Sequence, residues 1–203
     1  MLVSNFELLI SRIAPVPSAG PNPPFNRKVV QGYFLSITNL DETRDLKLNV
    51  VIVSSKATGA DINRDFIPIT NASVIYDNAP TVQNNVSLPL VATNPVNAFV
   101  NTFRTENMPA IKPLQTVLVA ILPNAMLAGN PITSLEIRGH VRLHQVPNAN
   151  GSMPANIKVM LSAECRGTFL DENAQTPTSS FDFDQIAYSL EIASGAALNN
   201  LTD

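Results

Sequence analysis

The chain has 203 residues, of which 45% are hydrophobic, so it can bury a sizeable core, and its formal net charge is −3. All 13 Lys and Arg lie at or before Arg166, and this acidic C-terminal end argues against nucleic acid as a main partner. No apolar run approaches the ~20 residues that span a bilayer. The N-terminal residues lack a signal-peptide pattern, which predicts cytoplasmic synthesis.

The polar residues of the chain are mostly uncharged. Only 14% of the residues are charged, against about a quarter in a typical protein, and 22 Asn contribute to the difference. A surface with so little charge suits a protein that packs against copies of itself or another protein, or one that binds neutral sugars. The alternative is a monomer that uses Asn in its loops. The single cysteine excludes an intrachain disulfide.

The N-terminal part of the chain predicts a strand followed by a stiff arm. Phe6, Leu8 and Ile10 alternate with polar residues, as in a short strand. Residues 14–28 contain five prolines, which donate no ladder hydrogen bonds and favour extended polyproline geometry. This arm is either an ordinary surface loop or a connection that carries the first strand to a neighbouring subunit.

Most of the remaining chain shows strand-type alternation interrupted by Asn, Pro and Gly, with little helical periodicity. One helical turn is expected at 123–129 and a loose tail at 194–203. Further strands are predicted at 29–39, 46–53, 66–70, 73–76, 86–91, 98–104, 116–122 and 186–192.

The clearest pattern lies between residues 135 and 169, where two segments alternate strictly between apolar and polar residues. We predict that they pair as a hairpin. A register with Glu136 opposite Arg166 and Arg138 opposite Glu164 joins opposite charges, whereas a shift by two residues opposes two arginines. The predicted fold is therefore all-β, an antiparallel β-sandwich of about ten short strands in a single domain over 1–203, either Ig-like or jelly-roll.

Two histidines and one cysteine are the most reactive side chains of this region. His140 and His144 lie four residues apart on a predicted strand, about 13 Å from each other, which is too far to share a metal. With Arg138 and Arg142 on the same face, they hold an anion or simply form a solvated face. Cys165 is expected to be a small buried residue on the opposite face from both histidines, without the base that a catalytic thiol needs.

Carboxylates near the C-terminus form the candidate metal site. Asp171, Glu172, Asp182 and Asp184 are a weak candidate calcium site, and the alternative is a set of surface carboxylates without a metal. No catalytic or cofactor-binding residues are assigned and no cofactor is expected, because the Gly-x-Ser-x-Gly, dinucleotide-binding and phosphate-loop motifs are absent.

Three functions are compatible with these features. The leading expectation is a non-enzymatic structural or interaction protein that forms homo-oligomers. A carbohydrate-binding module is the second, but the chain has no Trp and only three Tyr to stack on sugar rings. An enzyme with an unrecognised site is the third.

Overall fold

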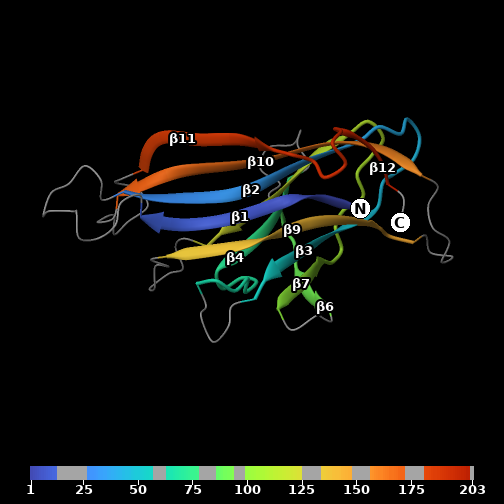
Figure 1. The fold of residues 1–203 in the computed structure, drawn as a ribbon. Coiled ribbons are helices and arrows are strands. Elements are labelled where there is room, and N and C mark those ends of the chain that lie inside the picture. Colours follow the sequence, from blue (N-terminus) through green and yellow to red (C-terminus); the bar gives the residue numbers. More distant parts are fainter. Residues whose placement is uncertain are drawn as a thin grey trace, which may run out of the picture.

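The computed structural model describes residues 1–12, 27–56, 63–77, 86–93, 99–124, 134–147, 156–171 and 181–201. These residues form antiparallel strands and no helix, which confirms the predicted all-β antiparallel fold (Figure 1). The strands are β1 (Leu2–Arg12), β2 (Arg27–Asn39), β3 (Leu48–Ser55), β4 (Ala72–Asp77), β5 (Val86–Ser87), β6 (Leu90–Thr93), β7 (Val100–Thr105), β8 (Thr116–Pro123), β9 (Leu135–Gln145), β10 (Ile157–Asp171), β11 (Phe181–Leu190) and β12 (Leu198–Leu201).

Strand β2 is the branch point of the sheet. One of its edges pairs with β10 over the whole length of β2, and the other edge is shared by two strands. Its first half pairs with β1, and its second half pairs with β8. From β1 the sheet continues through β9, β3 and β7 to β6, and from β8 it continues through β4 to β5.

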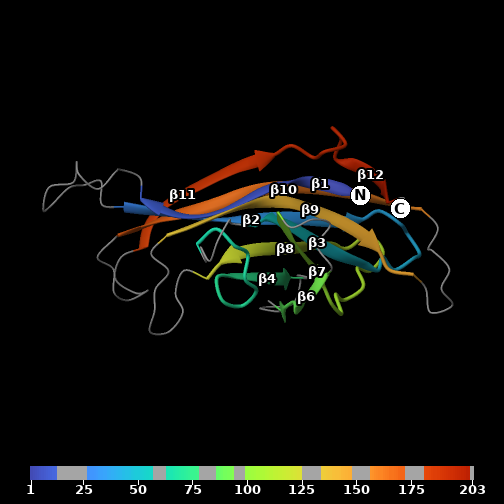
Figure 2. The same ribbon diagram turned by 60° about the horizontal axis from the view of Figure 1, so that its bottom comes forward.

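The two branches meet again at the segment 86–93. Strands β5 and β6 are separated only by Leu88 and Pro89, and they pair with β4 and β7 respectively. The Leu88 amide donates to Val74 of one branch, and Pro89 accepts from Glu106 of the other. Backbone pairing and the covalent segment 86–93 together therefore join the strands into a ring. Figure 2 shows β4, β6, β7 and β8 below β1, β2, β9 and β10. Because all twelve strands belong to one curled sheet, the Ig-like or jelly-roll sandwich stays a prediction.

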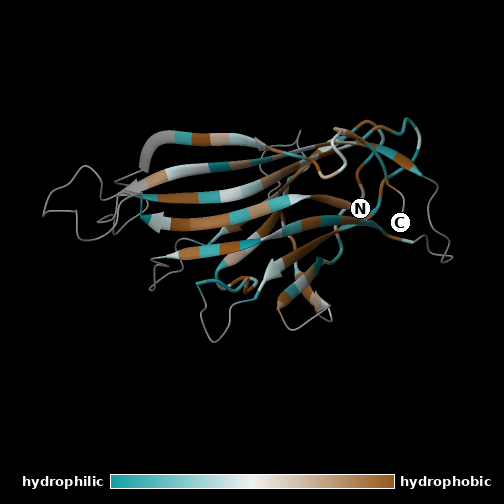
Figure 3. Cartoon of the chain, in the orientation of Figure 1, coloured by the Kyte–Doolittle hydropathy of each residue, from teal (hydrophilic) through white to brown (hydrophobic). Residues whose placement is uncertain are grey.

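The hydrophobic core fills the space between the two branches. Alternate residues of β1, β2, β3, β8, β9 and β10 point inward, as the period of two in a strand requires. Figure 3 shows this as alternating hydrophobic and hydrophilic bands along β1 and β9. Fully buried members include Leu8, Leu35, Ile52, Val119 and Leu161.

The predicted hairpin between β9 and β10 is wrong, although both strands exist and both bury the predicted alternate residues. Strands β2 and β1 lie between them. Arg138 pairs with Glu7 of β1 at 2.7 Å and with Glu136 of its own strand at 2.8 Å. Arg166 pairs with Glu164, also within one strand. Charge complementarity correctly indicated that Arg138 pairs with a carboxylate. That carboxylate comes from β1, however, which is not part of the predicted hairpin.

Three local predictions also need correction. The predicted strand at 66–70 is a tight turn, because the Asn71 side chain accepts from the Ile67 amide and donates to the Asp65 carbonyl. The predicted loose tail contains β12, whose Leu201 is buried against the core. Residues 27 and 28 belong to β2 rather than to the predicted arm. The rest of the arm lies outside the described residues, which omit 13–26. Residues 125–129 of the predicted helical turn also lie outside them.

Two glycines allow the close approach of strands. Gly32 lies where the partner of β2 changes from β1 to β8, and a Cβ there would lie 2.8 Å from the Leu122 side chain. Gly139 of β9 opposes Phe6 of β1, and a Cβ there would overlap the Val53 carbonyl oxygen and lie 2.7 Å from the Phe6 ring. The Phe6 ring therefore occupies the space that a side chain at position 139 would need.

Replacement of Gly139 by alanine is expected to destabilise the fold strongly. The added methyl meets backbone as well as the Phe6 ring, so β1 and β3 must move apart, and we expect a loss of about 3 kcal/mol in the free energy of unfolding. Urea denaturation measures this loss. Ser162→Ala, on the exposed face of β10, is the control and should change stability by less than about 0.5 kcal/mol. Equal stability of the two variants would contradict this view of the β1–β9 contact.

A buried hydrogen bond between side chains connects β1 to β2. The hydroxyls of Ser4 and Tyr33 lie 2.7 Å apart, and both side chains are buried. Burial raises the pKa of Tyr33 well above its ordinary value, so the phenol stays protonated. The Tyr33 ring also packs against Phe6, with 6.1 Å between ring centroids.

Tyr33→Phe should cost about 1–2 kcal/mol of the free energy of unfolding, because it leaves the buried Ser4 hydroxyl without this partner. In the double variant Tyr33→Phe/Ser4→Ala both hydroxyls are absent, so its loss should be smaller than the sum of the two single losses. A double-mutant cycle by urea denaturation gives this coupling. Simple additivity would show that the two hydroxyls do not interact.

Candidate functional site

The first candidate site is the outer edge of β11. This ten-residue strand pairs with β10 along one edge, and no described strand pairs with its other edge. Figures 1 and 2 show β11 along the border of the sheet, on the far side of β10 from β2.

Backbone geometry shows which groups of β11 face outward. The Leu161 amide of β10 donates to Ala197, on the side where β11 and β12 lie. Amides alternate in direction along an antiparallel strand, so Cys165 also directs its amide to this side and bonds its partner Tyr188. Ala187 and Ser189, one residue to either side of Tyr188, then direct their N–H and C=O groups outward.

The β11 edge lacks the usual protection against pairing. Natural edge strands carry Lys or Pro, are very short, or are strongly bulged. From Gln185 to Leu190, β11 contains no charged residue and no Pro, and its register with β10 is regular; Asp182, Asp184 and the irregularity of the register lie nearer Phe181. Tyr188 is 44% exposed on this strand.

Cys165 lies on β10 opposite Tyr188 of β11 and is buried, as predicted. Burial raises the pKa of its thiol, while hydrogen bonds to Tyr188 and to the Glu7 backbone act in the opposite direction. A raised pKa does not favour the thiolate that nucleophilic chemistry requires. The thiol is therefore a packing group beside Tyr188, on the side of β11 that pairs with β10.

The predicted placement of Cys165 relative to the histidines is wrong. Opposed residues share a face of a sheet, and so do residues two apart in one strand. Cys165 opposes Tyr33, which shares its face with Gln31; Gln31 opposes Leu9, and Leu9 opposes Glu136, which shares its face with His140. Cys165 and the histidines therefore belong to the same side of the curled sheet. The prediction depended on direct pairing of β9 with β10, which does not occur.

The polar face of β9 contains both histidines, as predicted. His140 opposes Asn5 of β1 and Val53 of β3, and its Nε2 atom is buried without a hydrogen-bond partner in the described part of the chain. Burial lowers the pKa of His140, and the positive charge of Arg142 lowers it further. This imidazole is therefore held neutral by its surroundings.

The weak calcium candidates are only partly described. Glu172 lies outside the described residues, as do the side chains of Asp171, Asp182 and Asp184. The backbone register places Asp182 opposite Phe169, two residues from Asp171. Within the described residues, no three His, Cys, Asp or Glu side chains are grouped so that they could hold a metal. The calcium site stays a prediction.

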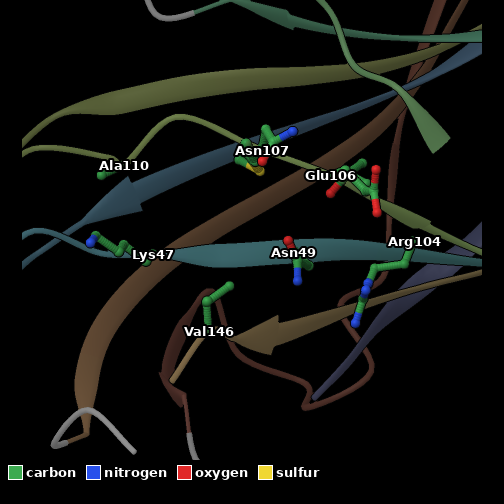
Figure 4. Close-up of a pocket in the computed structure, with 9 residues that line it drawn as sticks. Lys47, Asn49, Arg104, Glu106, Asn107, Ala110 and Val146 are labelled. Carbon is green, nitrogen blue, oxygen red and sulfur yellow. The ribbon is translucent and has the colours of Figure 1, made fainter. Parts of the chain in front are cut away.

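The second candidate site is an open cleft of about 620 Å³ beside β3 and β7. In Figure 4 the side chain of Asn49 lies between those of Lys47 and Arg104. The lining residues are Lys47, Asn49, Arg104, Thr105, Glu106, Asn107, Met108, Ala110 and Val146. Sequence reasoning missed this site. Arg104 lies in a predicted strand, but nothing in the sequence shows which strand lies beside it.

Aromatic exposure bears on the carbohydrate alternative. Tyr33 and Tyr76 are buried, whereas Tyr188 is 44% and Phe99 is 72% exposed. Tyr188 lies on β11, and Phe99 lies next to the start of β7, so in the described part the two do not lie on paired strands.

Comparison with known proteins returned no relationship: the chain matches no protein-family model and no curated protein. The described part of the chain contains no helix with the length and hydropathy of a membrane span.

The depressed pKa of His140 predicts a loss of stability in mild acid. The ordinary pKa is 6.5, and the folded value is lower, so the unfolded chain takes up this proton first as the pH falls. The destabilising effect of this pKa difference is absent well above pH 6.5 and grows as the pH falls below 6.5. His140→Gln should therefore lose less stability than the wild type between pH 7 and pH 5, measured by urea denaturation. A slope identical to that of the wild type would contradict the assignment, and His144→Gln serves as the matched control.

Proposed function

We propose that this protein is a non-enzymatic structural subunit that assembles with copies of itself by joining sheets at β11. The observation that supports the proposal is the unpaired edge of β11, with the outward backbone groups of Ala187 and Ser189. An exposed row of unpaired N–H and C=O groups is a template for pairing with another strand. The low charge of the chain reduces repulsion between copies.

A second copy of β11 is the simplest occupant of this edge. Two identical strands meet antiparallel across a two-fold axis, so each edge satisfies the other. Hydrogen-bonded positions must match, which restricts the register to opposition among Gln185, Ala187 and Ser189. With Ala187 opposite Ala187 of the second copy, Ile186 opposes Tyr188 twice. Aromatic and β-branched residues form favourable cross-strand pairs, so this register is the one we expect.

The alternative functions lack an equivalent observation. A sugar-binding surface is favoured by neighbouring exposed aromatics, and the exposed Tyr188 and Phe99 belong to different parts of the sheet. Tyr188 instead lies where the proposed contact would cover it.

Sedimentation velocity over a range of concentrations tests the assembly. We expect the wild type to form dimers or larger species. Ser189→Lys should shift the protein toward monomer, because it places a charged side chain on the free edge, opposite Gln185 of the second copy, and a charged residue is a common protection of an edge strand. Ala187→Pro should act in the same way, since it removes an outward amide but no hydrogen bond to β10.

Ser162→Lys is the matched control, because it adds the same charge to an exposed position of β10 that is not on the free edge. It should leave the oligomeric state unchanged. A wild type that stays monomeric at every concentration would overturn the proposed assembly. Assembly that neither Ser189→Lys nor Ala187→Pro weakens would show that another surface carries it.

A further inference from the structure

We infer that the outer face of β9, β3 and β7 carries a binding site for a small oxyanion of the phosphate or sulfate type. This inference is independent of the assembly proposed for β11, because it concerns a different part of the sheet. It rests on the convergence of three strands that are far apart in the sequence.

The pairing registers place two arginines on one row. Val51 of β3 opposes Arg142 of β9 on one side and Arg104 of β7 on the other. Opposed residues share a face, and neighbouring strands lie about 4.8 Å apart, so the two arginine Cα atoms are separated by about 10 Å. Val51 is only 8% exposed although it lies on the outer face, which is consistent with cover from the stems of the two arginines.

The next row adds polar and basic groups. Asn49, two residues before Val51, opposes His144 of β9. Lys47 precedes Asn49 by two residues and lines the same cleft as Asn49 and Arg104. Lys47, Arg104 and the Asn49 amide therefore line the cleft itself, while Arg142 lies on the same face by its pairing with Val51. Cations and an amide gathered on one face form the donor set that an oxyanion requires.

The charges at this site are not neutralised within the described part of the chain. Arg44, Lys112, Arg138 and Arg166 each form an ion pair with a carboxylate. Lys47, Arg104 and Arg142 form no ion pair with any described residue.

Glu106 is the only carboxylate among the residues that line the cleft, so positive charge exceeds negative charge there. This contrasts with the net charge of −3 of the whole chain. A local excess of cations on an acidic protein concentrates small anions at that point of its surface.

The ligand chemistry follows from the donor geometry. Guanidinium groups bind phosphate and sulfate oxygens in a bidentate manner, and Lys47 adds a point charge. The cleft is open, so a free ion or an oxyanion group on a larger molecule can enter it.

Titration of isotopically labelled protein with inorganic phosphate, and separately with inorganic sulfate, tests the inference by NMR. Sodium chloride keeps the ionic strength constant. We expect saturable shifts of the Asn49, Val51 and Arg104 amides with at least one of the two anions. Arg104→Gln and Arg142→Gln should each weaken this binding about tenfold, the effect of losing one charge-assisted hydrogen bond.

Two further variants separate the site from general charge effects. Arg104→Lys keeps the charge and should retain more of the affinity than Arg104→Gln. Lys158→Gln removes an exposed cation of β10 and should leave binding unchanged. Shifts that rise linearly without saturation for both anions, or equal weakening by Arg104→Gln and Lys158→Gln, would overturn the inference. Because the readout is anion binding, its failure leaves the test of the β11 edge unaffected.

Discussion

The architecture depends on the way in which β2 shares one edge between two partners. A strand edge offers only one backbone hydrogen-bond row, so β1 and β8 cannot both occupy the same length of it. The change of partner falls at Gly32, where a side chain would crowd Leu122. Beyond this point β1 is separated from β2, and the core fills the space between the two branches.

The same division determines which edge remains free. The two branches are joined covalently at the segment 86–93, whose strands β5 and β6 pair with β4 and β7 respectively. Strand β10 occupies the remaining edge of β2, and β11 extends the sheet beyond the ring. The outer edge of β11 therefore lies outside the joined branches, and no described strand pairs with it.

The polar face of the sheet shows how strand pairing assembles a site from distant residues. Arg142 and Arg104 are 38 positions apart, yet both oppose Val51. Arg138, only four residues from Arg142, is neutralised by Glu7 and Glu136. Arg138 and Arg142 lie close together in the sequence, but only Arg138 is neutralised in the described part of the chain, because β1 supplies a carboxylate to Arg138 and not to Arg142.

Local periodicity in the sequence determined most of the strand positions and which residues of β9 and β10 point inward, since a period of two reflects burial on one face. It also determined that Arg138 and Arg166 need carboxylate partners. The tertiary structure alone decided which strands are neighbours, and so it overturned the hairpin between β9 and β10 and the position of Cys165 relative to the histidines. The physical reason is that alternation specifies a face but not a partner. Backbone hydrogen bonds are chemically identical along every edge, so the choice depends on packing of the whole core around Phe6, Tyr33 and Gly139.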